Sequence, residues 1–217
     1  MRINLCFHGI GDTPLEREPG EPRYWITPGL FQRIMDEVPR FADVALSFDD
    51  GNRSDVDLGL PALLDRGLGA TFFALAGRLD DGASLAPGDL RHLRASGMRI
   101  GSHGWAHVPW RDLSDADARR ELTDARIALE EASGGAIPDA ALPLGRYDRR
   151  LLVSLKRLGY ETVYTSDRFP ARRGSWLQAR YSVTADDTVD SVRAVLRHRV
   201  RPGDAVKLAK SVAKRLR

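Results

Sequence analysis

Two short segments of the chain carry the residue types of a metal-dependent hydrolase. An apolar run ends in the adjacent carboxylates Asp49 and Asp50, and the histidines His103 and His107 follow further along the chain. One carboxylate and two imidazoles can hold a divalent cation, which leaves the other carboxylate to act as a base on water. The pattern therefore predicts metal-assisted hydrolysis.

Each motif alone is weak evidence, because Asp-Asp-Gly is a common turn and His-x-x-x-His occurs by chance on helices. Two carboxylates at the end of a buried strand are costly, however, unless a cation or hydrogen-bond donors compensate their charge. We therefore take the two segments as parts of one site.

The elements that must position these residues alternate between strand-like and helix-like patterns, which favours a parallel α/β sheet or barrel. Strands are expected at 2–8, 43–48, 70–76, 98–102, 140–144, 161–165 and 177–183. Helices are expected at 28–38, 57–66, 87–96, 114–131, 149–158 and 188–199. The candidate residues fall at or just beyond strand C-terminal ends, the face on which barrel enzymes carry their active sites. They are His8, Asp49, Asp50, His103, Pro143 and Asp167.

Five ordered segments resemble the polysaccharide deacetylases, nodulation-type carbohydrate esterases that remove N-acetyl groups from amino sugars. The segments are 5–10, 44–53, 69–74, 100–107 and 142–148. The resemblance implies a distorted (β/α) barrel of about seven parallel strands, with residues 1–217 forming a single catalytic domain. It implies an N-acetylated amino sugar in a glycan, glycolipid or sugar-nucleotide precursor as substrate. A catalytically inactive carbohydrate-binding barrel and a deacylase of a small non-sugar amide are the alternatives.

The family match assigns the metal ligands and the base. Asp50, His103 and His107 are expected to bind the metal, and Asp49 is expected to be the general base. Zinc is the first choice of cofactor for these ligands, with cobalt, nickel, manganese or iron as other possibilities.

The general acid departs from the common family layout. The usual late Leu-x-His segment would fall at Leu196 to His198, where the sequence has the pattern of a basic helix. His8 resembles the N-terminal active-site histidine of a rearranged variant of the family, and the first and last strands of a closed barrel are neighbours. We expect His8 to be the acid; a structural strand histidine is the alternative. Asp167 is expected either to orient this histidine or to be a solvated loop residue.

A second departure is the missing arginine of the family's Arg-x-Pro-Tyr-Gly motif, where this chain has Ala-Leu-Pro-Leu-Gly at 141–145. Arg180 is expected to supply the guanidinium that orients Asp49, with Arg53 and Arg146 as rivals. The backbone N–H of Leu144 is expected to face the oxyanion, in a turn shaped by Pro143 and Gly145.

Aromatic residues on the predicted active face suit the apolar faces of sugar rings. The candidates for substrate contact are Trp105, Trp110, Tyr147 and Trp176, each with core packing as the alternative. Trp25, earlier in the chain, is expected to pack.

Charge and composition narrow the remaining possibilities. The net charge of +3 is modest and no recognition motif accompanies it, so no nucleic-acid partner is expected. The single cysteine, Cys6, excludes an internal disulfide framework, and the first apolar run is too short for a signal peptide, so we expect a cytoplasmic protein. Segment 200–217 has the spacing of a basic amphipathic helix. It either seals the barrel or contacts an anionic membrane surface or a lipid-linked glycan precursor.

Overall fold

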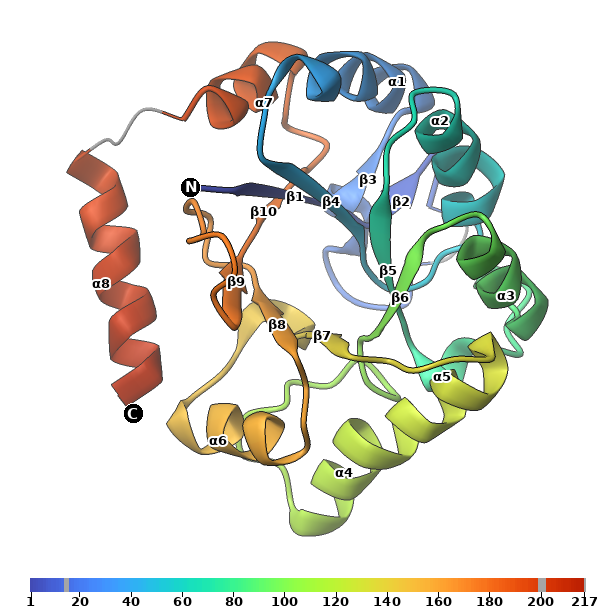
Figure 1. Ribbon diagram of the computed structural model, residues 1–217, viewed down its shortest axis with the longest axis vertical. Coiled ribbons are helices and arrows are strands. Elements are labelled where there is room, and N and C mark those ends of the chain that lie inside the picture. The colour runs from blue at the N-terminus through green and yellow to red at the C-terminus, as the bar shows by residue number, and fades with distance from the viewer. Residues whose placement is uncertain (14–15, 199–201, 217) are drawn as a thin grey trace.

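The computed structural model describes residues 1–13, 16–198 and 202–216, with a parallel sheet, nearly closed into a barrel, at its centre (Figure 1). The eight strands lie in the order β10-β1-β4-β5-β6-β7-β8-β9, and each pairs in parallel with its neighbours. Their bounds are β1 Ile3–Phe7, β4 Val44–Phe48, β5 Ala70–Ala74, β6 Arg99–Ser102, β7 Asp139–Ala141, β8 Thr162–Thr165, β9 Leu177–Ala179 and β10 Tyr181–Ser182. The expected parallel barrel is confirmed.

One strand differs from expectation in a way that matters for the site. The segment expected to be a single strand over 177–183 is divided at Arg180, because β9 pairs with β8 whereas β10 pairs with β1. The chain thus crosses from one edge of the sheet to the other at Arg180. The sequence pattern does not reveal this change of partner, because both halves are strand-like.

Helices form a ring around the sheet (Figure 1). They are α1 Pro28–Glu37, α2 Leu60–Leu64, α3 Pro87–Ala95, α4 Asp115–Arg119, α5 Ala125–Ser133, α6 Arg149–Arg157, α7 Val189–Leu196 and α8 Pro202–Leu216. Helices α1, α4 and α6 begin where a side-chain oxygen of Thr27, Ser114 or Asp148 accepts a backbone N–H, a contact that stabilises a helix start. The π-helical segment η3 Asp55–Gly59 continues directly into α2. A second one, η5 Arg120–Asp124, connects α4 to α5.

Alternation along the strands separates an outer core from the barrel interior. Ile3, Leu5 and Phe7 of β1 pack in the main hydrophobic core, whereas the Asn4 amide donates to Gln178 Oε1 at 3.1 Å and to the Ala179 carbonyl at 2.9 Å. Polar side chains thus line part of the interior, hydrogen-bonded to one another. By the same period of two, the side chain that follows Ser47 on the interior side is that of Asp49.

Two features lie outside the main barrel. The short strands β2 Gly9–Ile10 and β3 Trp25–Ile26 form a separate parallel pair that the sequence analysis did not predict, since two residues are too few to show an alternating pattern. Trp25 is buried there, as expected. Of the basic segment 200–217, residues 202–216 form α8, and the other three lie outside the described residues. No helix among the described residues combines the length and the apolar character needed to cross a bilayer.

Candidate active site

A pocket of about 190 Å³ opens at the C-terminal ends of the strands. His8 follows β1, Asp49 and Asp50 follow β4, and His103 follows β6, so the barrel brings these residues to one face. The rest of the wall comes from the 18–24 segment, the short helix η4 Ala76–Arg78, the loops after β6, β7 and β8, and the strand β10. These lining residues are Glu18, Pro19, Gly20, Glu21, Tyr24, Arg78, His107, Leu142, Leu144, Ser166 and Ser182.

Asp50, His103 and His107 converge in this pocket. The Nε2 atoms of His103 and His107 each lie 3.4 Å from Asp50 Oδ1. His103 Nδ1 is 2.9 Å from the carbonyl of Ala141, and His107 Nδ1 is 2.5 Å from Glu18 Oε1. Because both partners can only accept, each Nδ1 carries a proton, and each Nε2 faces Asp50.

Three potential metal-ligand atoms, Asp50 Oδ1 and the two Nε2 atoms, therefore face one another in the pocket. Asp50 Oδ1 has no hydrogen-bond partner among the described residues, which is costly for a buried carboxylate. Burial, partly opposed by the charge of Asp49, lowers the pKa of His103 to about 4, so its ring is neutral at physiological pH. A divalent cation would satisfy all three atoms at once. Asp50, His103 and His107 thus fit a metal through their donor chemistry.

Strained backbone accompanies the site. Asp50, His107 and Leu144 have φ values of 73°, 57° and 55°, in the left-handed region that non-glycine residues seldom occupy. For Asp50 the consequence is direct. The left-handed turn breaks the strand alternation, so both neighbouring carboxylates reach the same pocket.

Arg180 holds Asp49 through two parallel hydrogen bonds. Its NH1 and NH2 donate to Asp49 Oδ1 and Oδ2, each at 2.6 Å, and NH1 also donates to Ser47 Oγ at 3.0 Å. Burial disfavours ionisation of Asp49, but the adjacent guanidinium outweighs it and holds the pKa of this carboxyl well below its usual range. The rival arginines lie elsewhere: Arg53 pairs with Asp57 and Asp89, and Arg146 is exposed.

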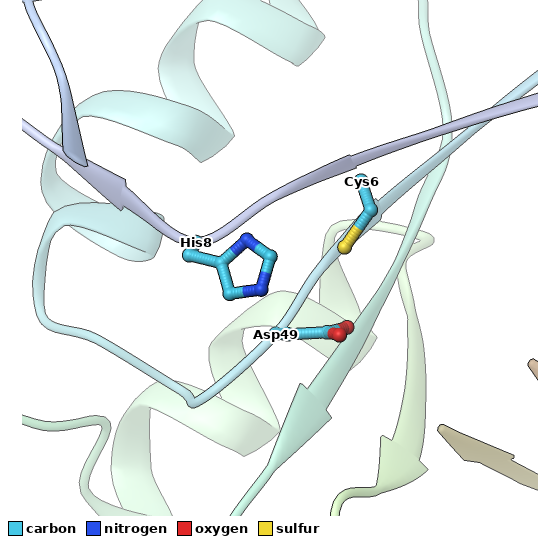
Figure 2. A group of neighbouring side chains, drawn as sticks. All are labelled: Cys6, His8 and Asp49. Atoms are coloured by element: carbon cyan, nitrogen blue, oxygen red, sulfur yellow. The ribbon is translucent and has the colours of Figure 1, made fainter. Parts of the chain in front are cut away.

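The side chains of His8, Cys6 and Asp49 lie close to one another (Figure 2). One ligand-type atom from each of Cys6, His8 and Asp49 lies within 4.8 Å of the others, so this group could be considered a second metal site. It fits a metal poorly, because Arg180 already occupies both oxygens of Asp49. Burial also raises the pKa of the Cys6 thiol well above its ordinary value, and a neutral thiol is a poor ligand.

Two residues that the sequence analysis did not identify, Glu18 and Glu121, contact the loop that contains His107. Glu18 contacts His107 and also accepts from Arg78 at 3.1 Å. Glu121, buried in η5, accepts from the backbone N–H groups of Trp105 and Ala106 at 2.8 and 3.1 Å. Neither carboxylate lies in a recognisable motif. The one signal in the sequence is Glu121 itself, an acidic residue on a helix face that is otherwise buried.

Asp167 is not placed where it was expected to orient His8. Its carboxylate accepts from Tyr147 at 2.6 Å, Thr165 at 2.9 Å and Lys214 at 2.7 Å. The expected role is therefore corrected. Asp167 ties the loop after β8 to α8, because cationic and hydroxyl donors of those elements surround it.

The expected aromatic surface for sugar rings is also not formed. Trp110 and Tyr147 are buried in a second hydrophobic cluster, and the Trp176 indole donates to the Tyr160 carbonyl at the opposite end of the barrel. Trp105 packs partly buried against the main core. Among the described residues, Tyr24 is the aromatic side chain in the pocket wall, and its ring lies 4.7 Å from that of His8.

The turn after β7 lies at the pocket. Pro143 and Gly145 are buried, and Leu144 between them is half exposed and lines the pocket. Gly145 has a φ of 62°, and a Cβ there would lie 3.2 Å from the Ser166 side chain. His198 lies beyond the end of α7, near Asp204, and does not line this pocket.

Comparison with known sequences identifies the family. The sequence model described as Polysaccharide deacetylase matches residues 37–163, more than half of the chain. This chain belongs to the polysaccharide deacetylase family. The matched region contains Asp49, Asp50, His103 and His107, whereas His8 and Arg180 lie outside it.

Individual relatives are more distant. A chitin deacetylase from Colletotrichum lindemuthianum is 29% identical over 57% of this chain and 50% of its own length. The peptidoglycan-N-acetylmuramic acid deacetylase PdaC from Bacillus subtilis is 32% identical over 42% of this chain and 19% of its own length. The chain thus matches half or less of either relative.

Solved structures share the fold of this chain. The deacetylase PplD from Streptococcus pyogenes superposes with a TM-score of 0.75 at 19% identity, over 90% of this chain and 97% of its own. IcaB from Ammonifex degensii gives a TM-score of 0.74 at 20% identity, over the same shares of the two chains.

Proposed function

We propose that this chain is a metal-dependent N-deacetylase that hydrolyses the acetamide of an N-acetylated amino sugar in a glycan, glycolipid or sugar-nucleotide precursor. The observation that carries the proposal is the cluster of three potential metal ligands, Asp50, His103 and His107, beside an ionised Asp49 held by Arg180. The family membership and the deacetylase relatives support the reaction class.

Asp50, His103 and His107 would hold the metal, with zinc as the first choice for a site of two imidazoles and one carboxylate. When bound, the metal supplies a Lewis acid that polarises the amide carbonyl and acidifies water. The open side of the cluster faces the pocket, where a substrate would bind.

Asp49 is proposed as the base. Its lowered pKa keeps it ionised at neutral pH, and Arg180 fixes its orientation through both oxygens. His8 is proposed as the acid that protonates the departing amine, and the Leu144 N–H as a donor to the developing oxyanion. An inactive carbohydrate-binding barrel is less favoured, because the arginine absent from the family motif is supplied by Arg180.

The test combines metal analysis with acetate release from a panel of N-acetylglucosamine derivatives. His103→Ala should lose bound metal and acetate release together, because a ligand is removed. Asp49→Asn should keep its metal and lose roughly two orders of magnitude or more in turnover. Full activity after rigorous chelation would contradict the metal assignment, and near-normal turnover of Asp49→Asn would exclude that residue as the base.

A further inference from the structure

Helix α8 turns most of its apolar residues away from the barrel. Val206 is 57% exposed, Leu208 50%, Val212 41% and Leu216 74%, and the alanines between them are exposed as well. Of the α8 side chains from 204 to 216, that of Ser211 is the buried one. The helix is held to the barrel mainly through polar contacts of Ser211 and Lys214 with Tyr147 and Asp167.

Helix α8 has one apolar side and one basic side. At 3.6 residues per turn, Leu208, Val212, Leu216 and the alanines at 205, 209 and 213 share one wide side with Val206. Lys207, Lys210 and Lys214 form the adjacent stripe on the helix. A soluble helix normally buries such an apolar side against its own protein. In α8 the apolar side is exposed instead.

A groove of about 1120 Å³ continues this surface between α8, α6 and the segment from Phe169 to Leu177. Its walls are largely apolar, with Leu152, Val153 and Phe169 facing Leu208. Four cations line it, and Asp204 is the one carboxylate among the described lining residues. The cations are Arg149, Lys156, Arg172 and Arg215.

The charges around the groove indicate which kind of partner would bind there. Asp204 is already near His198 at 3.7 Å and Lys207 at 3.6 Å, whereas Arg149 and Arg172 form no ion pair with a described carboxylate. Basic side chains beside an exposed apolar helix face attract an anionic lipid surface. A second copy of the chain would bring the same lysine stripe against itself, which like-charge repulsion disfavours.

We propose that α8 and this groove dock on an anionic phospholipid bilayer. The helix lies in the plane of the interface, with its apolar side among the acyl chains and Lys207 and Lys210 at the phosphates, and a lipid chain enters the groove. Lys214 also donates to the Gly145 carbonyl at 3.3 Å, beside Leu144 of the pocket wall. Docking would therefore hold the candidate active site close to the membrane surface. The inference stands independently of the proposed deacetylase activity.

The experiment is vesicle flotation of the full chain with phosphatidylcholine vesicles, with and without phosphatidylglycerol. We expect partitioning onto the phosphatidylglycerol vesicles that is lost at high salt, because screening weakens the attraction. Lys210→Glu should lower the partition coefficient by about tenfold or more. Leu208→Ser should lower it by roughly fivefold, since less apolar surface enters the bilayer.

Matched controls separate docking from general effects of charge or hydrophobicity. Arg91→Glu on α3, far from α8 in Figure 1, makes the same charge change, and Ile127→Ser, 48% exposed on α5, makes the same kind of apolar change. Both should partition like the original chain, and thermal unfolding should show that all four variants are folded. Absent binding, equal binding to neutral vesicles, or equal losses in controls and α8 variants would overturn the proposal. So would concentration-dependent dimers that Leu208→Ser dissociates.

Discussion

At the scale of single residues, hydrogen bonds determine which nitrogen of His103 and of His107 carries a proton in the candidate site. Backbone and carboxylate acceptors fix Nδ1–H of both histidines, and Arg180 keeps Asp49 ionised. His8 differs from the other two histidines of the pocket, because its Nδ1 is buried without a hydrogen-bond partner among the described residues. A histidine whose proton is not committed to a protein acceptor suits transfer to a substrate.

Replacement of His8 by Ala should lower turnover by about 100-fold or more with metal content unchanged, as expected when a general acid is removed. Steady-state acetate release together with metal analysis would check this. His198→Ala is the matched control and should change turnover little, because His198 lies near Asp204 and outside the pocket. The reverse result would move the acid to His198.

Glu18 should tune the affinity of the site. Glu18→Gln removes the charge that faces Nδ1 of His107, and loss of such an outer partner typically weakens metal binding by about 10- to 100-fold. Competition with a chromophoric chelator measures the affinity directly. Glu16→Gln, an exposed carboxylate two residues away, should leave it unchanged. Equal affinity of the two variants would show that Glu18 has no part in holding His107.

At the scale of elements, the features that could be predicted are those that depend on hydrophobic periodicity and on the residues at helix and strand ends. The alternating strands and helices, the helix that begins near 114 and the positions of Asp49, Asp50 and His103 at strand ends could all be predicted. The partners of Asp167, the burial of Trp110 and the packing of Trp176 could not. They depend on which loops meet, and single-sequence patterns carry no information on that.

The helical turn that follows the aspartate pair contains an unusual carboxyl. Asp55, at the start of η3, is fully buried, and neither of its oxygens has a hydrogen-bond partner among the described residues. Burial raises its pKa well above the ordinary value, and the charges of Asp50 and Asp49 raise it further. The folded state thus binds this proton more tightly than the unfolded state, so the stability it contributes is present at acid pH and is lost as the pH rises.

Asp55→Asn should therefore stabilise the metal-free protein at neutral pH, by about 1–3 kcal/mol, because the neutral amide carries no charge for burial and for Asp49 and Asp50 to disfavour. For a chain of this size, each kcal/mol corresponds to about 2–4 °C in melting temperature. The gain should shrink as the pH falls toward and below about 3.9, the ordinary pKa of Asp, because Asp55 then becomes protonated in the unfolded state as well. Melting curves across this range, recorded with a chelator present, test the prediction. Asp57→Asn, exposed on the same turn, should show no such pH-dependent gain.

At the scale of the whole molecule, the proposed metal ligands follow β4 and β6, two strands that β5 separates in the sheet. A cation bound there should stabilise the folded barrel, by about 2.7 kcal/mol at a free concentration 100 times the dissociation constant. The expected rise is roughly 5–10 °C in melting temperature. His103→Ala should abolish it. Cys6→Ala should retain all of it, and a smaller rise in that variant would show that the group around Cys6 also binds metal.

The crossing of the chain at Arg180 links barrel closure to the chemistry. The residue at which the chain passes from β9 to β10 is also the one whose side chain grips Asp49. During synthesis from the N-terminus, the three proposed metal ligands emerge long before Arg180 does. A growing chain would thus contain all three of these residues before Asp49 is held in place. If the proposed function holds, activity would require β10 to pair with β1.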